Sequence, residues 1–206
     1  MTKHRLSNLL AALALGLSSA TAYSAASSAS RTLHASIESD GNRTYHQKNE
    51  YGHHPATIEC VIAAAQRQGV PANVLLGIAS IEMGKNGDRL NNTNKSQDLG
   101  HFGINTIHFQ PGEPLAEAGI RPEDVATRGC YNAEVAAWLL RKKLNDQRGA
   151  GGFWVWAANY HSVTPENNAI YRKKLIRYSE QWGRWLKYRY PQVSIYQPPP
   201  PKGELQ

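Results

Sequence analysis

The chain has few cysteines and none of the short motifs that hold a metal ion or a nucleotide. Only two of its 206 residues are cysteine, and its eight histidines form no His-Glu-x-x-His pattern. A glycine-rich phosphate loop is missing, and Gly77-Ile78-Ala79-Ser80 lacks the rest of a nucleophile elbow. The sequence therefore predicts no metal site and no cofactor, which argues against metalloenzymes and nucleotide-dependent enzymes.

Long hydrophobic runs are also missing, apart from one stretch near the N-terminus. Leu6–Leu17 is apolar, but a helix that crosses a bilayer needs roughly 20 such residues. Lys3 and Arg5 precede this stretch, and the small residues Ala20-Thr21-Ala22 follow it. We expect residues 1–22 to be a cleaved signal peptide and the mature protein to be periplasmic or exported. An uncleaved signal anchor is the alternative.

Acidic residues are the minority charge, with 16 Asp and Glu against 23 Lys and Arg and a formal net charge of +7. Loss of Lys3 and Arg5 with the signal peptide leaves +5. Outside the cytoplasm such a balance favours anionic cell-wall glycans or lipid headgroups as partners, and we expect no nucleic acid.

The two cysteines are expected to pair, because an exported chain with an even number of cysteines is usually oxidised. A bridge between Cys60 and Cys130 closes a loop of 70 residues, which stabilises the fold by roughly 4 kcal/mol on the chain-entropy model. A catalytic thiol is the alternative, although no Cys–His signature is present.

One folded domain is expected between two segments of biased amino-acid composition. Residues 23–52, rich in Ala, Ser and polar residues, are predicted to be a flexible leader. Residues 191–206 are predicted to be a proline-rich tail, because they contain the run Pro198–Pro201. The domain would then span residues 53–190, and we expect it to be a monomer.

Helical periodicity dominates this domain, and the predicted fold class is mainly α. Expected helices are Ala56–Gln68, Pro71–Glu82, Asn132–Gln147, Phe153–Tyr160 and Pro165–Tyr190. The Lys85–Thr106 segment is rich in Asn, Gly, Asp and Ser and predicts a polar loop or a small hairpin. Long loops of this kind inside a domain are often functional.

Glu82 is the strongest catalytic candidate. It follows Leu75, Ile78 and Ala79 on one apolar helical face, and Gly84 is expected to cap the helix just after it. Burial and the negative end of the helix dipole both disfavour a charged carboxylate. A carboxyl group that stays neutral near pH 7 can donate a proton to a leaving group, as in glycosidic bond cleavage. A Glu that merely reaches solvent is the alternative.

Three segments, one of which contains Glu82, carry a resemblance to a known family. They are Glu82-Met83-Gly84, the run Gly-His-Phe-Gly-Ile-Asn at Gly100–Asn105, and Ala-Asn-Tyr-His-Ser at Ala158–Ser162, followed by Tyr171. Together they resemble the lysozyme-like domain of soluble lytic transglycosylases, most closely the small exported type associated with type IV secretion, conjugation and pilus systems. The resemblance covers Ala56–Lys187 and implies an α+β lysozyme-like fold.

The match to this family has departures. Gly103 stands where the family usually has Gln, and Asn159-Tyr160 inverts the usual Tyr-Asn order. Ser96 and Asp98 precede the second motif as in many members, and the cysteine positions are similar to those of the secretion-associated type.

The resemblance implies a set of residues that act on peptidoglycan glycan strands. Glu82 would be the catalytic residue. The implied substrate-binding residues are Ser96, Phe102, Asn105, Asn159, Tyr160 and Tyr171. Plain core packing is the alternative for Tyr160 and Tyr171, and a core aromatic is the alternative for Phe102.

The implied reaction is cleavage of the MurNAc-GlcNAc β-1,4 bond with formation of 1,6-anhydroMurNAc, with Glu82 acting first as acid and then as base. If the enzyme is instead a hydrolytic muramidase, Asp88 or Asp98 is the candidate second acid, although we expect Asp98 to be a turn-forming residue whose side chain bonds its own backbone. A non-catalytic peptidoglycan-binding component of an envelope machine is the other alternative. A type IV secretion, conjugation or pilus apparatus is the implied partner.

The closing helix combines aromatic residues with many bases and few acids. Such a pattern fits either a surface for nucleic acid or acidic lipid, or aromatics that face the core with a solvated basic side. The second interpretation is the expected one.

Overall fold

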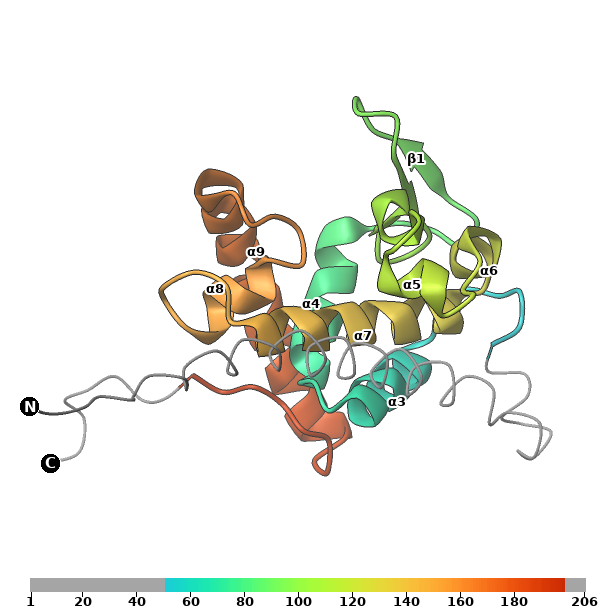
Figure 1. Ribbon diagram of the computed structural model, residues 1–206. Helices are drawn as coiled ribbons and strands as arrows, with labels where there is room; N and C mark the ends of the chain where they lie inside the picture. Colours follow the sequence, from blue (N-terminus) through green and yellow to red (C-terminus); the bar gives the residue numbers. More distant parts are fainter. Residues whose placement is uncertain (1–50, 199–206) are drawn as a thin grey trace, which may run out of the picture.

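Two long helices, α7 (Gly129–Asp146) and α9 (Pro165–Arg189), run through the molecule, and most other helices pack against one of them (Figure 1). The computed structural model describes residues 51–198. The remaining elements are α3 (Ile58–Gln68), α4 (Ala72–Glu82), β1 (Arg89–Asn91), β2 (Gln97–Leu99), β3 (Ile104–Asn105), the 3-10 helix η2 (Thr106–Phe109), α5 (Pro114–Glu117), α6 (Pro122–Thr127) and α8 (Phe153–Ala158). The mainly α fold class is therefore confirmed, with a small sheet after α4.

Several predicted segments lie wholly or partly outside the described residues. These are the signal peptide at 1–22, the leader except for its last two residues, and the proline-rich tail after Pro198.

Helix α3 begins and ends, and α4 begins, where local chemistry predicts. Thr57 precedes α3, and its hydroxyl accepts a hydrogen bond from the Cys60 backbone N–H at 3.2 Å. Gly69 ends α3 in the left-handed conformation, with φ 64°. Pro71, which has no N–H to lose, then precedes α4. Because the turn between the helices is this short, α4 packs back against α3.

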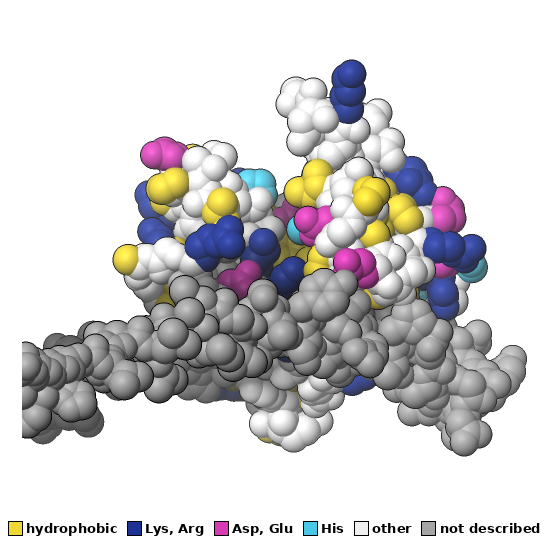
Figure 2. Space-filling model, in the orientation of Figure 1, with side chains coloured by type: hydrophobic (Ala, Val, Ile, Leu, Met, Phe, Trp, Pro, Cys, Tyr) yellow, Lys and Arg dark blue, Asp and Glu magenta, His cyan; other side chains and the backbone are white. Residues whose placement is uncertain are grey.

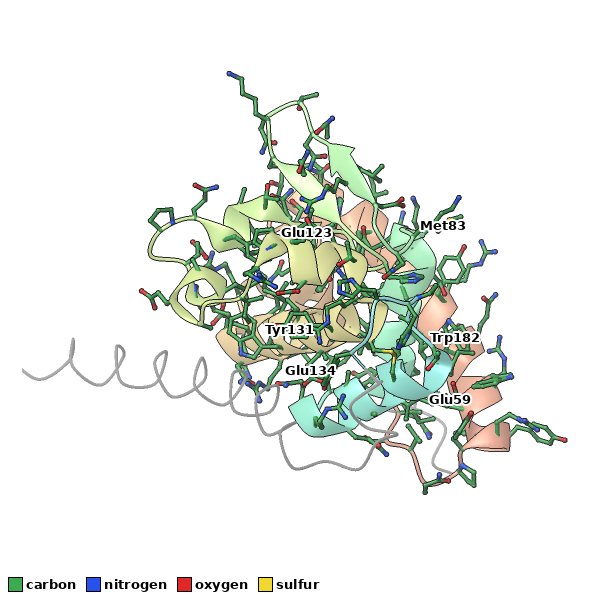
Figure 3. The ribbon with its side chains drawn as sticks, turned by 90° about the vertical axis from the view of Figure 1, so that its right-hand side faces the viewer. Glu59, Met83, Glu123, Tyr131, Glu134 and Trp182 are labelled. Atoms are coloured by element: carbon green, nitrogen blue, oxygen red, sulfur yellow. A yellow bond between two sulfur atoms is a disulfide. The ribbon has the colours of Figure 1, made fainter. Side chains whose placement is uncertain are left out.

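The end of α4 differs from the prediction that Gly84 caps it. Met83 takes the left-handed position with φ 52°, and its N–H donates to the Ala79 carbonyl. Its side chain is 76% exposed at the edge of the domain (Figure 3). Gly84 serves a different purpose, because a Cβ there would lie 2.1 Å from the Gly100 carbonyl oxygen. The glycine lets the chain after α4 pass against the chain after β2.

The polar segment after α4 forms a three-stranded antiparallel sheet in the order β1-β2-β3. Leu99 pairs with Arg89 on one side and with Ile104 on the other. Leu99 and Ile104 are both fully buried and anchor the sheet to the core. Because successive side chains of a strand point to opposite faces, Asp98 faces away from the core beside Leu99.

A disulfide and a buried ion pair join α3 to α7. Cys60 and Cys130 are bonded, with their Cα atoms 5.6 Å apart, which confirms the predicted pairing. The bridge is visible in yellow in Figure 3. One turn further along α7, the fully buried Glu134 accepts hydrogen bonds from Arg67 at 2.9 Å and Gln68 at 2.6 Å. Both carboxylate oxygens are thus paired, as a buried charge requires.

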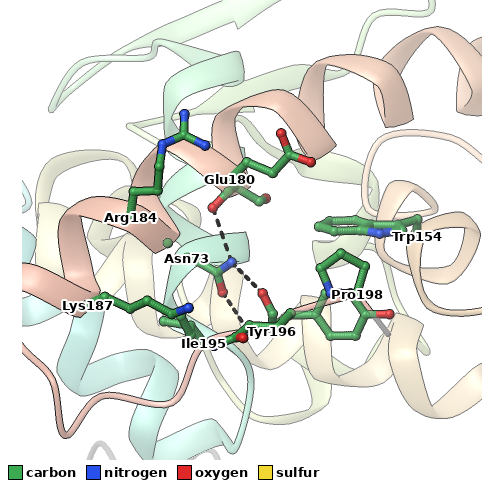
Figure 4. A pocket seen from close by; sticks show the side chains of 11 residues that line it. Asn73, Trp154, Glu180, Arg184, Lys187, Ile195, Tyr196 and Pro198 are labelled. Atoms are coloured by element: carbon green, nitrogen blue, oxygen red, sulfur yellow. Dashed lines mark hydrogen bonds between the residues drawn. The ribbon is translucent and has the colours of Figure 1, made fainter. Parts of the chain in front are cut away.

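The folded part extends beyond residues 53–190 at both ends. Tyr51 is 1% exposed, and its ring meets Tyr131 edge-on at 5.9 Å. After α9 the chain turns back, and the Tyr196 ring stacks on Phe153 at 3.6 Å. Asn73 holds this returning segment: its amide donates to the Tyr196 carbonyl and accepts from the Tyr196 N–H (Figure 4).

Helix α9 places its apolar residues inward and its bases outward. Tyr171, Leu175 and Leu186 are buried, whereas Lys173, Lys174, Arg177, Arg184, Lys187 and Arg189 are exposed. This arrangement fits the solvated basic side that the sequence led us to expect. No helix within residues 51–198 combines the length and the apolar character needed to cross a membrane.

We predict that Gly84→Ala destabilises the fold by about 3 kcal/mol, because the added methyl group collides with backbone that cannot move aside. Gly69→Ala is the matched control: it also loses a glycine at a chain turn, but no atom lies within 4 Å of its Cβ position. Its cost is about 1 kcal/mol of left-handed backbone strain. Urea unfolding of both variants measures the difference, and equal losses would contradict the close approach described here.

Candidate active site

A groove of about 570 Å³ crosses the domain between the sheet and the segment that joins α8 to α9. Figure 2 shows the notch between these two parts of the molecule on one face. Its wall on the sheet side contains Asn92, Thr93, Asn94, Asp98, Gly103, Ile104, Asn105, Ile107 and His108. The other lining residues are Glu82, Leu139, Lys143, Asn159, Tyr160, His161, Ser162 and Val163.

Glu82 is the last residue of α4, and its carboxyl group forms part of the groove wall. Its Oε1 atom accepts a hydrogen bond of 2.7 Å from the Tyr171 hydroxyl of α9. On its other side lies Gly103, where a Cβ would be 3.0 Å from Oε2. The absence of a side chain at Gly103, where the resembled family has Gln, therefore leaves this oxygen open to the groove.

The surroundings of Glu82 favour its neutral form. The pKa of its carboxyl group is raised to about 7, chiefly by burial and to a smaller extent by the negative charge of Asp98. The Tyr171 hydroxyl and the positive charge of Lys174 act in the opposite direction and lower the pKa. Burial is the largest of these effects, so near pH 7 a substantial fraction of the group holds a proton. The direction of this shift agrees with the expectation that burial favours a neutral acid.

Two tyrosines lie near the carboxyl group, and one of them bonds it. Tyr171 is buried, and burial together with the neighbouring Glu82 charge raises the pKa of its phenol well above the usual range. It therefore remains a hydrogen-bond donor. The Tyr160 hydroxyl donates to the Phe102 carbonyl at 3.0 Å and does not bond Glu82. The structure thus brings both predicted tyrosines to the site, Tyr171 in contact with the acid and Tyr160 on the groove wall.

Phe102 is corrected by the structure. Its side chain is 0% exposed and belongs to the core, so it cannot offer a face to a sugar. Its backbone is what serves the site, because the carbonyl holds Tyr160 and the N–H donates to Asn132 at 2.9 Å. The core alternative for this residue is the right one.

Two predicted polar residues support the sheet beside the groove. Ser96 is buried and lies outside the groove lining. Asn105 does line the groove, but its amide donates to Ser96 at 3.0 Å and to Asp98 at 2.7 Å. Its side-chain oxygen Oδ1 accepts a hydrogen bond from the Ile107 backbone N–H. The polar atoms of Ser96 and Asn105 thus bond other protein groups, and these two residues hold the groove wall in shape.

Asn159 is similarly engaged. Its amide donates to the Arg148 carbonyl at 2.7 Å, and its oxygen accepts from Asn168 at 2.9 Å. It is 5% exposed and lines the groove. In the inverted order Asn159-Tyr160, the Asn159 amide is therefore bonded within the protein, whereas the Tyr160 side chain lines the groove. The Asn159 amide is not free to bind a sugar.

Of the two candidate second acids, only Asp98 reaches the groove. Its Oδ1 accepts from Asn105, and it sits in strand β2 with its backbone paired on both sides. The turn-forming interpretation of Asp98 is therefore wrong. Asp88 takes that role instead, since its carboxylate accepts from the Lys85 N–H at 2.7 Å.

The groove residues that the sequence reasoning missed include three titratable side chains, His108, Lys143 and His161. The His161 ring stacks on Tyr171 with ring centres 4.7 Å apart and planes 3° from parallel. No spacing links these residues to Glu82 along the chain. Only His161 had a signal, as a member of the Ala158–Ser162 motif.

Within residues 51–198, the His, Cys, Asp and Glu side chains form no group of three or more that could hold a metal ion.

Comparison with known proteins gives two similar chains. No family model matches the sequence. Protein IpgF of Shigella flexneri is 29% identical over 136 residues, which cover 65% of this chain and 84% of that protein. Protein IpgF of Shigella sonnei is 29% identical over 131 residues, which cover 63% of this chain and 80% of that protein. The chain is therefore similar to IpgF over most of the length of IpgF.

The raised pKa of Glu82 predicts a specific pH dependence of stability. Glu82→Gln removes the titration and keeps the shape. Relative to that variant, the free energy of unfolding of the wild type is highest below pH 4.5, falls as the pH rises, and levels off above about pH 7. We expect a total fall of about 2 kcal/mol, allowing for the partial exposure of the carboxyl group.

Tyr171→Phe sharpens this prediction. Loss of the hydroxyl removes an interaction that lowers the Glu82 pKa, so the fall continues to higher pH than in the wild type. Denaturant unfolding between pH 4 and 9 measures all three proteins. A wild type whose stability follows that of Glu82→Gln at every pH would contradict the raised pKa.

Proposed function

We propose that the protein is a peptidoglycan lytic transglycosylase with Glu82 as its catalytic acid and base. The observation that carries this proposal is a protonatable carboxyl group with a pKa of about 7 in the wall of a groove of about 570 Å³. The resemblance of the Glu82, Gly100–Asn105 and Ala158–Ser162 segments to lytic transglycosylases supports it, and the similarity to IpgF is compatible with it.

The proposed reaction uses one side chain twice. The protonated Glu82 donates its hydrogen to the oxygen of the MurNAc-GlcNAc β-1,4 bond as that bond breaks. The resulting carboxylate then accepts the proton of the muramic acid 6-hydroxyl while that oxygen bonds to the anomeric carbon. The product is 1,6-anhydroMurNAc, water is not consumed, and Glu82 returns to its protonated form.

The neighbours of Glu82 suit both halves of this cycle. Burial and Asp98 favour the protonated state that the first step needs. Tyr171 and Lys174 stabilise the carboxylate that the second step needs, and the Tyr171 bond also holds the group in place. A pKa near the working pH lets the same group serve as acid and as base.

The cellular setting follows from the sequence and is part of the proposal. Export by the segment at residues 1–22 would bring the enzyme to the periplasm or beyond, where peptidoglycan lies. The resemblance to the secretion-associated type favours a role in opening the cell wall for a secretion, conjugation or pilus apparatus.

Hydrolysis by a muramidase is the second candidate, because Asp98 lines the same groove as Glu82. In that reaction a second carboxylate would activate water or form a covalent intermediate. The hydrogen bond from Asn105 to Asp98 holds this carboxylate in the sheet, which fits an electrostatic effect on Glu82 better than direct attack.

The first test is release of soluble fragments from purified sacculi. We predict that Glu82→Gln lowers turnover by about 10³-fold or more, because it removes the proton donor and leaves the fold intact. Gln at this position can still accept the Tyr171 hydrogen bond. Undiminished release by a folded Glu82→Gln protein would refute the assignment, and binding of sacculi with no release by the wild type would favour a non-catalytic role.

The second test uses Asp98→Asn and the mass of the products. We predict that this variant still forms anhydro products, and that the alkaline limb of its pH–rate profile moves to lower pH because a charge that raises the Glu82 pKa is gone. Mass spectrometry distinguishes the routes, since a hydrolysed product is heavier by one water. Hydrolysed products from the wild type, lost in Asp98→Asn, would establish the muramidase instead.

A further inference from the structure

A second pocket of about 270 Å³ opens from the side of the active-site groove. The two share Ile107, His108, Leu139 and Lys143 as a common wall. We call this pocket the basic branch, because Lys142, Lys143 and Arg148 line it. It is formed by η2, α5 and the C-terminal half of α7, so it lies beside the groove and away from Glu82, which lines only the groove.

Lys143 stands where the groove and the basic branch meet. It is half-buried, and it makes no ion pair with another described residue. Burial lowers the pKa of its amine, and the neighbouring charges of Lys142 and Arg148 lower it further. A partly desolvated cation without a partner is costly to a protein, and a ligand carboxylate would offset that cost.

The other charges of the basic branch have mixed sign. Lys142 lies over the Trp138 ring at 5.5 Å, which fixes its direction along the wall. Glu113 and Asp146 also line the pocket and raise the Lys143 pKa. Three cations against two anions give a small positive excess, and a lining of both signs fits a ligand that carries carboxylates together with an amine.

We propose that the basic branch binds the peptide stem that hangs from the glycan strand, with Lys142 and Lys143 pairing its carboxylates. The proposal rests on the proposed function, since a strand in the groove brings its substituents to the shared wall. A stem carries several carboxylates, and an amine where it contains a diamino acid. The neutral sugars of the strand would thus lie in the groove and the charged substituent in the branch, so the enzyme would prefer strands that still bear peptides.

The test measures binding to the full-length Glu82→Gln protein, so that no ligand is consumed. Three ligands with the same sugars are compared: a strand fragment with its stems, the same fragment with the stem carboxylates amidated, and a fragment without stems, which keeps the lactyl carboxylate. We expect the stem-bearing fragment to bind about tenfold more tightly than either of the others.

Substitution of the cations should remove this preference. With Lys142→Met and Lys143→Met together, the affinities for stem-bearing and amidated fragments should agree within about twofold. The matched control is Lys173→Met with Lys187→Met, which loses the same charge from exposed positions on α9 that line neither pocket, and it should keep the tenfold preference. Thermal unfolding verifies that both double variants are folded.

Three outcomes would overturn the inference: equal binding of stem-bearing and amidated fragments, a preference that survives in Lys142→Met/Lys143→Met, or equally tight binding of the stem-free fragment, which would assign the cations to the lactyl carboxylate. Failure of the proposed function is seen separately, as absence of fragment release from sacculi by the wild type. Release of anhydro products together with any of the three outcomes refutes only the basic branch.

Discussion

The hydrogen bond between the Tyr171 hydroxyl and the Glu82 carboxyl is the interaction on which the site depends. It joins the last residue of α4 to the first turns of α9, 89 positions later in the chain. Each partner needs the other: without Tyr171 the carboxyl group would lose its fixed direction, and without Glu82 the buried phenol would lack an acceptor. The rest of the domain serves to bring these two helix ends together.

The balance of forces on Glu82 suits the proposed reaction, in which one carboxyl group acts as acid and as base. Burial alone would hold the proton too firmly for a base, and full exposure would release it too easily for an acid. The Tyr171 bond and the charges of Lys174 and Asp98 adjust the pKa to about 7. Gly103 completes the arrangement, because a larger residue would press against the oxygen that faces the groove. Glycine in place of the Gln of the resembled motif thus avoids a steric contact with the Glu82 carboxyl group.

The sequence predicted much of the fold and the position of Glu82 at the buried end of α4, for reasons that are local. Apolar periodicity marks helices such as α4 and α9, and Gly69 ends α3 as expected. The cap after Glu82 was assigned to the wrong residue, since propensity favours glycine and cannot reveal that Gly84 is needed for a contact with Gly100. That contact joins two segments that meet only in the folded chain.

The groove itself could not be predicted from the sequence, for a similar reason. Phe102 and Asn105 lie close together in one motif, yet one is core and the other lines the groove, because the turn before β3 separates their directions. His108 and Lys143 come from η2 and α7 and meet only through packing. Periodicity shows which face of an element is buried, and it does not show which exposed side chains from distant elements converge.

The protonation of Glu82 in the folded protein is the central claim, and its titration can be observed directly. Carbon-13 NMR of protein labelled at the glutamate carboxyl carbons follows each group with pH, and comparison with Glu82→Gln assigns the signal of Glu82. The account predicts that this signal titrates with a midpoint of about 7. A midpoint near 4.5, the ordinary value for a glutamate, would contradict it.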